Sequence, residues 1–359
     1  MPVGLVHDRP EALVAAWFVA FAFAVTSGLA CAGQPIDADL GVETRAYETI
    51  VGLPAVETWN LVDGLSFWAI PREPPTGYYC SVDASSSEAL RSSLHNLISP
   101  HTAYPYTNSS HPGDSNHKVD TWDIIALADA YPADSSTVLD IYRNRVFDRQ
   151  YYGYALCSDD LYQREHSWPK AYGFKWEPPD SRPWENPAWV DCHHLFAAYC
   201  DDNHDRSNYP YASGDVTLAT CRPTDATLGR GSSSGDDCNY LLDLVPGGST
   251  ESWQTWLGRR GDVARALFYM DIRYEGGTAG EANLELTDSR TRIKNSSATA
   301  FRTQETAYMG LLSTLLQWHA DDPVDDLERR RNTVVFLFQG NRNPFIDHPE
   351  WVTIILGTD

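Results

Sequence analysis

Three short stretches between residues 164 and 210 hold side chains that could do chemistry together. They read Arg-Glu-His-Ser-Trp-Pro-Lys at 164–170, Asp-Cys-His-His-Leu-Phe at 191–196 and Asn-His-Asp-Arg-Ser-Asn-Tyr-Pro at 203–210. Metal-assisted cleavage of a phosphodiester needs oxygen ligands for a hard cation and a neutral histidine that takes a proton from water. It also needs cations that hold the phosphate. The carboxylates, imidazoles, amides and guanidiniums of these stretches supply each requirement.

The overall charge of the chain is unfavourable for a polyanionic partner, but its distribution is less so. The 359 residues carry a formal net charge of −22. Fifteen acidic and four basic residues give residues 33–140 a local charge of −11, whereas seven basic residues face six acidic ones in 142–182. Because binding depends on the local field, a groove around the first stretch can still attract phosphate.

All three stretches resemble the signature of the bacterial endonuclease I family, which comprises secreted or periplasmic nucleases of the His-Me finger (ββα-metal) superfamily. Residues 78–96, 261–274 and 339–347 resemble further parts of the same family. The six matches follow one another in order from about residue 77 to 351. The resemblance implies an α+β fold, in which a ββα-metal finger core is embedded in a mostly helical single domain.

The resemblance also implies a ligand set and a base. Glu165 and Asn203 are expected to hold Mg²⁺, with Mn²⁺ or Ca²⁺ as substitutes, and His166 is expected to activate water as the general base. The implied reaction cuts DNA, and in many members RNA, to 5′-phosphate ends. Binding through phosphates carries no sequence information. Because His166 must be neutral, activity should rise through roughly pH 6–7.

Two arginines are the expected partners of the phosphate. Arg182 is the only arginine between residues 171 and 190, where the resemblance implies a phosphate-holding arginine. Arg206 either touches the phosphate or orients the finger. Supporting roles in the finger are expected of Arg164, Asp191, His193, His194 and Asn208.

The proposed ligands also have simpler interpretations. Glu165 could be the ion-pair partner of Arg164 or Lys170, and Asn203 could cap a helix. Neighbouring residues on a regular strand face opposite sides. Glu165 and His166 can therefore act on one phosphate only if the backbone bulges or the two groups approach it from different sides.

Two other functions are compatible with the residues. A zinc hydrolase would use His193, His194 and a cysteine, although no HExxH or CxxC spacing supports it. A secreted protein that binds nucleic acid without cleaving it could have kept the same fold. Such a protein would have no need for Glu165, His166 and Asn203, so their presence favours the enzyme.

Cysteines mark two departures from the family pattern. Residues 197–200 read Ala-Ala-Tyr-Cys where the family usually has a proline, and Cys192 replaces an aliphatic residue. A disulfide through this connection could stiffen the finger in place of the proline. A zinc site at Cys192 and Cys200 is the alternative. The six cysteines after residue 32 allow up to three disulfides in an exported chain, with the pairing open.

The first 32 residues are expected to be a secretory signal peptide. Residues 12–29 are almost unbroken apolar sequence, and Ala-Cys-Ala at 30–32 offers a cleavage site. An uncleaved membrane anchor is the alternative, because 18 apolar residues only just span a bilayer. The mature protein is expected to be a secreted or periplasmic monomer that makes no membrane contact.

Periodicity and turn residues predict how the remaining chain is organised. An irregular segment at 33–76 precedes one nuclease domain at 77–359, with the finger at about 155–212 and a surface insertion at about 222–250. A strand is expected around residues 151–154, leading toward Glu165. Helices are predicted at 87–99, 122–130, 262–274, 308–318 and 324–338, and a scaffold turn at 339–347.

Overall fold

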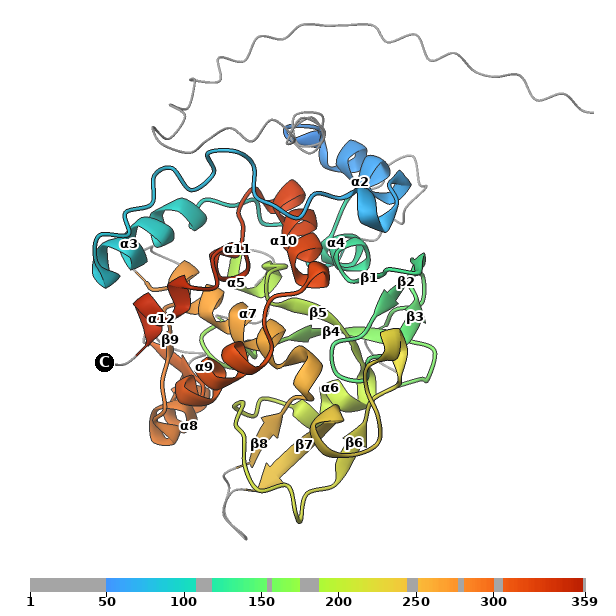
Figure 1. The fold of residues 1–359 in the computed structure, drawn as a ribbon, viewed down its shortest axis with the longest axis vertical. Helices are drawn as coiled ribbons and strands as arrows, with labels where there is room; N and C mark the ends of the chain where they lie inside the picture. The colour runs from blue at the N-terminus through green and yellow to red at the C-terminus, as the bar shows by residue number, and fades with distance from the viewer. Residues whose placement is uncertain are drawn as a thin grey trace, which may run out of the picture.

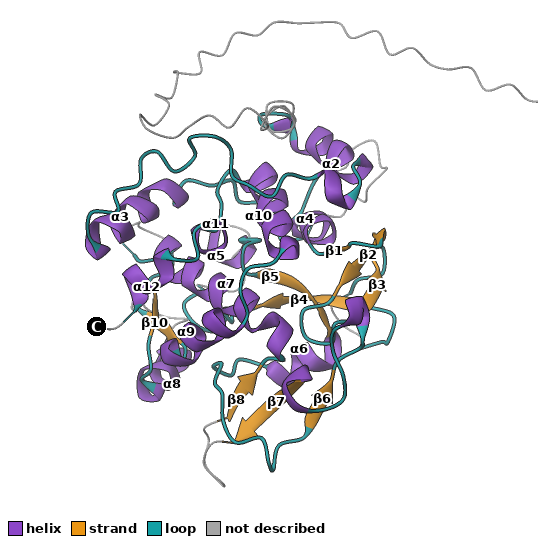
Figure 2. Ribbon diagram, in the orientation of Figure 1, coloured by secondary structure: helices purple, strands orange, loops and turns teal. Residues whose placement is uncertain are grey.

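The computed structural model describes residues 50–107, 118–153, 157–174, 187–243, 251–276, 281–299 and 306–357. Helices and small sheets combine in one mixed α+β fold, so the predicted α+β class is confirmed (Figures 1 and 2). The predicted signal peptide and Arg182 lie outside the described residues. No helix in the described part of the chain is long and apolar enough to cross a membrane.

Helix α7 (Arg260–Arg273) lies at the centre of the helical part of the molecule (Figure 1). The sequence predicts this helix with one apolar face, but every residue of α7 is buried. It packs against α3 (Ser87–Ile98), α9 (Leu312–Asp321) and α11 (Pro344–Asp347). Its polar positions are matched by partners, since Arg265 forms a buried ion pair with Glu328.

Capping residues explain why three helices begin where the sequence predicts. The Ser86 hydroxyl accepts a hydrogen bond from the Ala89 amide at the start of α3. Asp120 forms a capping box at the start of α4 (Thr121–Ala128), and Asp325 caps α10 (Asp326–Gln339). Helix α10 ends at Gly340, whose φ of +84° favours glycine. The predicted buried helix at 324–338 is confirmed.

Helix α2 (Ala55–Gly64) lies in the segment that the sequence predicts to be irregular. It buries Thr58 and Val62 and packs on α4 and α10. The helix has only a narrow apolar face, and so its sequence pattern is weak. Contacts with α4 and α10 provide the stability that the local sequence does not show.

Within the described residues, antiparallel strands make up three of the four small sheets. Strands β1 (Ala130–Tyr131), β2 (Asp134–Leu139) and β3 (Val146–Asp148) form one sheet. The other antiparallel sheets are β4 (Tyr162–His166) with β5 (Leu195–Tyr199), and β6 (Cys221–Pro223), β7 (Cys238–Asp243) and β8 (Glu251–Gln254). Strands β9 (Leu284–Leu286) and β10 (Ala307–Met309) pair in parallel. The shorter helices are α5 (Pro187–Val190), α6 (Cys200–Arg206), α8 (Arg290–Thr299) and α12 (Trp351–Leu356).

Several strand predictions need correction. Tyr152 makes only an isolated bridge to Tyr162, and the strand that leads to Glu165 begins at Tyr162 itself. The helix predicted at 308–318 begins at Leu312, because residues 307–309 pair with β9. Long-range pairing overrides the local helical pattern at this point.

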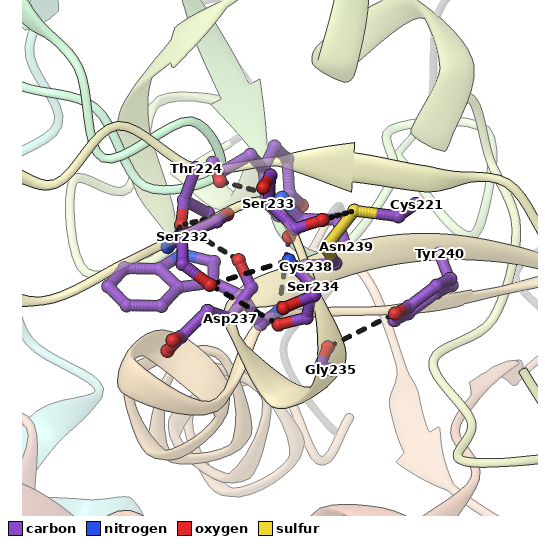
Figure 3. The surroundings of a disulfide bond; sticks show 12 residues. Cys221, Thr224, Ser232, Ser233, Ser234, Gly235, Asp237, Cys238, Asn239 and Tyr240 are labelled. Carbon is purple, nitrogen blue, oxygen red and sulfur yellow. Dashed lines mark hydrogen bonds between the residues drawn. A yellow bond between two sulfur atoms is a disulfide. The ribbon is translucent and has the colours of Figure 1, made fainter.

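The predicted insertion at about 222–250 contains an ordered sheet lobe. Figure 3 shows the disulfide between Cys221 and Cys238, which links β6 to β7. Beside it, the Thr224 hydroxyl donates to the Asp237 carbonyl at 2.7 Å and the Tyr240 hydroxyl donates to the Gly235 carbonyl at 3.1 Å. The Gly, Ser and Asp residues between 224 and 237 therefore form turns of a compact lobe.

Strand β5 separates two hydrophobic cores. Phe196 and Ala198 pack with α7 in one core, whereas Leu195, Ala197 and Tyr199 pack with α4 and α10 in the other. All five residues are buried, which explains why β5 reads as an unbroken apolar run. The strand is fixed on both faces and provides a rigid base for β4 and α6.

Candidate functional site

Most of the predicted site residues that the structure describes lie on a hairpin and the helix that follows it. Strand β4 pairs with β5 without a register shift from Tyr162 to His166, and α6 begins directly after β5. The Cys157–Cys200 disulfide joins the segment before β4 to the first residue of α6. This bond lies at the connection where a stiffening disulfide is predicted. The three elements thus hold the first and third motifs side by side.

Glu165 points toward α6 and is almost completely buried, with 2% exposure. The Tyr142 hydroxyl donates to Glu165 Oε1 at 2.8 Å, and Arg206 Nε lies 3.3 Å from the same oxygen. Burial raises the pKa of Glu165, whereas Arg206 and Tyr142 lower it and oppose that shift. The ion-pair partner of Glu165 is therefore Arg206, and not Arg164 or Lys170 as the simpler interpretation of the sequence suggested.

Asn203 faces the same side of β4 as Glu165. Its Nδ2 donates to Gln163 Oε1 at 3.0 Å, and Gln163 and Glu165 are two residues apart on the strand. Asn203 is the fourth residue of α6, so it does not cap the helix. Two contacts therefore connect α6 to one face of β4, Asn203 with Gln163 and Arg206 with Glu165.

His166 lies in a different, aromatic environment. Its ring centroid is 5.6 Å from Tyr106, 5.8 Å from Trp189 and 5.3 Å from His194. These neighbours differ from those of Glu165, and the strand pairing contains no bulge between the two residues. Of the two geometries that the sequence allows, the structure has Glu165 and His166 on different sides at the end of β4.

A backbone carbonyl fixes the tautomer of His166. Its Nε2 lies 2.9 Å from the Trp189 carbonyl oxygen, which can only accept, so Nε2 carries the hydrogen. In the neutral ring Nδ1 then keeps its lone pair. Burial, followed by the nearby His194 and Lys170, lowers the pKa of His166 well below its ordinary value. This direction favours the neutral form of the imidazole.

Arg164 stands in a stack of π systems rather than in the solvent. Its guanidinium carbon lies 3.4 Å from the Tyr106 ring centroid and 3.9 Å from that of Trp122. Tyr152 stacks on Trp122 with ring centroids 4.4 Å apart, and Tyr106 in turn neighbours His166. Tyr152, Trp122, Arg164, Tyr106 and His166 thus follow one another as neighbours. This position next to the imidazole agrees with the supporting role expected of Arg164.

Asp191 is the centre of a buried hydrogen-bond cluster. Its Oδ2 accepts from the Tyr269 hydroxyl at 2.7 Å and the Tyr274 hydroxyl at 2.9 Å. Its Oδ1 accepts from the His193 amide at 3.0 Å and from Gln339 Nε2 at 3.1 Å. Burial alone would raise the pKa of Asp191, but neighbouring histidines and these donors outweigh burial and lower it. Asp191 therefore organises the loop before β5.

His193 and His194 are held by main-chain carbonyls. His193 Nε2 donates to the Asn341 carbonyl at 3.0 Å and His194 Nε2 donates to the Ala188 carbonyl at 2.8 Å. Burial lowers the pKa of each to about 4, so both rings are neutral near pH 7. These contacts support the structural interpretation, and they link the loop to the predicted scaffold turn at 339–347.

Arg206 on α6 contacts the backbone at the end of β4. Its side chain has 1% exposure, and its guanidinium donates to the Ser167 carbonyl at 2.6 Å and the His166 carbonyl at 3.3 Å. Of its two predicted roles, these contacts support orientation of the finger. Asn208 is exposed beyond the end of α6.

The cysteines do not form the zinc site considered above. Cys200 is bonded to Cys157, and Cys192 is a free, buried thiol. Among the described residues, one cluster of three His, Cys, Asp or Glu residues could offer ligand atoms to a metal, namely Cys157, Cys200 and Asp201. Its sulfur atoms are joined in the disulfide. The ring nitrogens of His193 and His194 that face carbonyls are also committed to those contacts.

Several residues of the site were not predicted from the sequence. Tyr142 and Gln163 contact the two proposed ligands, and Trp189 fixes the imidazole of His166. The two-residue spacing of Gln163 and Glu165 on a predicted strand could have identified Gln163. No local pattern identifies Tyr142, which lies 23 positions from Glu165.

Comparison with known proteins defines the class of this chain. The family model of Endonuclease I matches residues 86–350. An extracellular ribonuclease of Bacillus amyloliquefaciens is 31% identical over 327 residues, or 91% of this chain and 92% of that protein. An extracellular ribonuclease of Bacillus subtilis (strain 168) is 32% identical over 284 residues, or 79% of each chain.

The chain is thus an enzyme that hydrolyses nucleic acid. It belongs to the Endonuclease I family, whose model matches most of its length. The resemblance predicted from six ordered matches is confirmed.

Proposed function

We propose that this protein is a secreted, Mg²⁺-dependent endonuclease that cuts DNA and RNA without reading sequence and leaves 5′-phosphate ends. His166 is the general base, Glu165 and Asn203 are the metal ligands, Arg182 assists at the phosphate and Arg206 orients the end of β4. The observation that carries the proposal is the hydrogen bond from His166 Nε2 to the Trp189 carbonyl at 2.9 Å. It presents the unprotonated Nδ1 of a neutral imidazole for proton transfer.

The residues around Glu165 fit a hard divalent cation. Glu165 and Asn203 face the same side of β4, and they offer a carboxylate and an amide oxygen, the donors that Mg²⁺ prefers. Tyr142 and Arg206 both contact Glu165 Oε1, and Gln163 contacts the amide nitrogen of Asn203. None of these contacts uses Glu165 Oε2 or Asn203 Oδ1, the two oxygen atoms that we propose bind the cation. A bound Mg²⁺ would polarise the phosphate and stabilise the departing 3′ oxygen.

Residues of the protein carry out proton transfer and hold the site in place. His166 Nδ1 takes a proton from the attacking water, and the Trp189 carbonyl keeps the ring in the required tautomer. Arg206 fixes the carbonyls of His166 and Ser167, so that the end of β4 does not move during the reaction. Because the two catalytic groups lie on different sides, the scissile phosphate must sit at the end of the strand.

Both nucleic acids are suitable substrates by this chemistry. The nucleophile is water, so the ribose 2′-hydroxyl is not required. The two Bacillus relatives are named as extracellular ribonucleases, which supports RNA as a substrate and secretion as the location. The disulfides at 157–200 and 221–238 support an oxidising compartment. We propose that the protein acts as a monomer.

A plasmid-nicking assay on the purified, oxidised protein tests the proposal. The wild type should cut with Mg²⁺ and stop with EDTA, and His166→Ala should lose about 10²- to 10⁴-fold in rate. His204→Ala is the matched control, because His204 is an exposed histidine on α6. Near-normal cleavage by His166→Ala would exclude His166 as the base. Binding of DNA and RNA without cleavage by the wild type would instead favour the non-catalytic binding protein.

A further inference from the structure

Charges near the candidate site are mostly neutralised within the protein. Arg206 is paired with Glu165 and backbone carbonyls, and Arg164 is enclosed between Tyr106 and Trp122. Arg143 is paired with Asp202 on α6. Among the described residues, these three arginines therefore already have partners within the protein.

Lys170 differs from these residues. It is exposed, and within the described ranges it forms no ion pair. It lies four positions after His166, in a turn where the Tyr172 amide donates to the Pro169 carbonyl at 2.9 Å. The buried Trp168 anchors this turn, since its Nε1 donates to the Tyr172 carbonyl at 2.8 Å. The backbone of Lys170 is consequently fixed while its ammonium group stays accessible.

Trp189 brings the ammonium group close to the catalytic base. Lys170 Nζ lies 5.0 Å from the Trp189 ring centroid, and the carbonyl of the same tryptophan holds His166. The indole N–H of Trp189 is buried and has no hydrogen-bond acceptor within the described ranges. The tryptophan next to Lys170 therefore has a donor that the protein itself does not use. Burial dominates the pKa shifts of Glu165 and His166, and Lys170 is among the charges that act on both groups.

From this geometry we infer that Lys170 binds the scissile phosphate and stabilises the charge that develops there during hydrolysis. The inference rests on the proposed function, because it assumes a phosphate at the end of β4. An ammonium group is a strong point-charge donor to phosphate oxygens, and such contacts strengthen as negative charge accumulates in the transition state. Lys170 would thus supply, from the turn after β4, a cation that Arg164 and Arg206 cannot supply.

The test compares Lys170→Gln and Lys170→Arg with the wild type in the full, oxidised chain. Lys294→Gln is the matched control, because it removes the same charge from the exposed face of α8. Cleavage of a fluorescein-labelled single-stranded DNA is measured with Mg²⁺. Binding of the same DNA is measured by anisotropy in EDTA over a series of salt concentrations. Lys170→Gln should lower kcat/KM roughly 10- to 100-fold, and Lys170→Arg should restore most of it.

The salt dependence separates phosphate contact from an indirect effect. Loss of one phosphate contact should reduce the slope of log K against log salt by about 0.7 for single-stranded DNA. Lys170→Gln should show this reduction together with slower cleavage, while Lys294→Gln keeps the wild-type kcat/KM. Lower activity with an unchanged slope would assign Lys170 a positioning role and overturn the inference. Normal cleavage by Lys170→Gln would overturn it too, and loss of cleavage in His166→Ala would show that the proposed function survives.

Discussion

The Cys157–Cys200 disulfide offers a direct test of how the site is held together. The perturbation is the double substitution Cys157→Ser with Cys200→Ala, which keeps a small apolar side chain at the buried position 200. The bond closes a loop with a sequence separation of 43. Loop-closure entropy for that length corresponds to a loss of about 4 kcal/mol in the free energy of unfolding.

The Cys221–Cys238 disulfide provides the matched control. It also joins a buried to a less buried cysteine, but its separation of 17 corresponds to about 3 kcal/mol. The two double variants should therefore be similar in stability and different in activity. Cys200 begins the helix that carries Asn203 and Arg206, so loss of its disulfide should lower kcat by roughly tenfold or more.

Urea unfolding and nuclease rates measured on the same preparations decide the outcome. The lobe variant Cys221→Ser with Cys238→Ala should keep most of its activity, because the lobe contacts α6 through the partly exposed Arg222–Asp205 pair, which contributes little. Equal losses of activity in both variants would refute the link between the first disulfide and the site. A stability loss below about 1 kcal/mol in the first variant would refute the estimate from loop closure.

Two further predictions concern the buried cluster around Asp191. Asp191→Asn should cost roughly 3 kcal/mol of unfolding free energy, since two tyrosine hydroxyls lose a charged acceptor, and urea unfolding at pH 7.5 measures this. A cost below 1 kcal/mol would contradict it. Because His193 and His194 have pKa values of about 4 in the folded state, against about 6.5 when unfolded, protonation favours the unfolded chain. Stability should be complete above pH 6.5 and fall toward pH 4, by about 2 kcal/mol for each histidine at pH 5. Unfolding curves that coincide at pH 7.5 and pH 5 would rule this out.

Local sequence predicted the elements whose determinants are local. The Ser86, Asp120 and Asp325 caps and the spacing of apolar residues locate α3, α4 and α10 to within a few residues. The alternation of a strand left two geometries for Glu165 and His166, a backbone bulge or an approach from different sides, and the separate neighbours of the two side chains agree with the second. The candidate site motifs were recognisable because they lie on one hairpin and the following helix.

Features that depend on distant partners could not be predicted in this way. The β9–β10 pairing replaces the first turn of a predicted helix, because residue 307 pairs with residue 284. The polar residues of 222–243 form an ordered lobe only through pairing with β8 and a disulfide. Tyr142 and Trp189 join the site through the fold, and neither stands out in the sequence.

The contacts of the scaffold turn at 339–347 bear on when this enzyme becomes active. Gln339 Oε1 accepts a hydrogen bond from the Cys192 amide at 2.6 Å, and the Asn341 carbonyl accepts one from His193 Nε2. Cys192 and His193 lie almost 150 residues earlier in the chain. During synthesis the segment from β4 to α6 is complete in sequence long before these partners leave the ribosome. A chain that ends before α10 should therefore bind and cut nothing. The loop at 191–193 should therefore reach its final form only after residues 339–341 have left the ribosome, so the site would stay incomplete while the segment from β4 to α6 is alone.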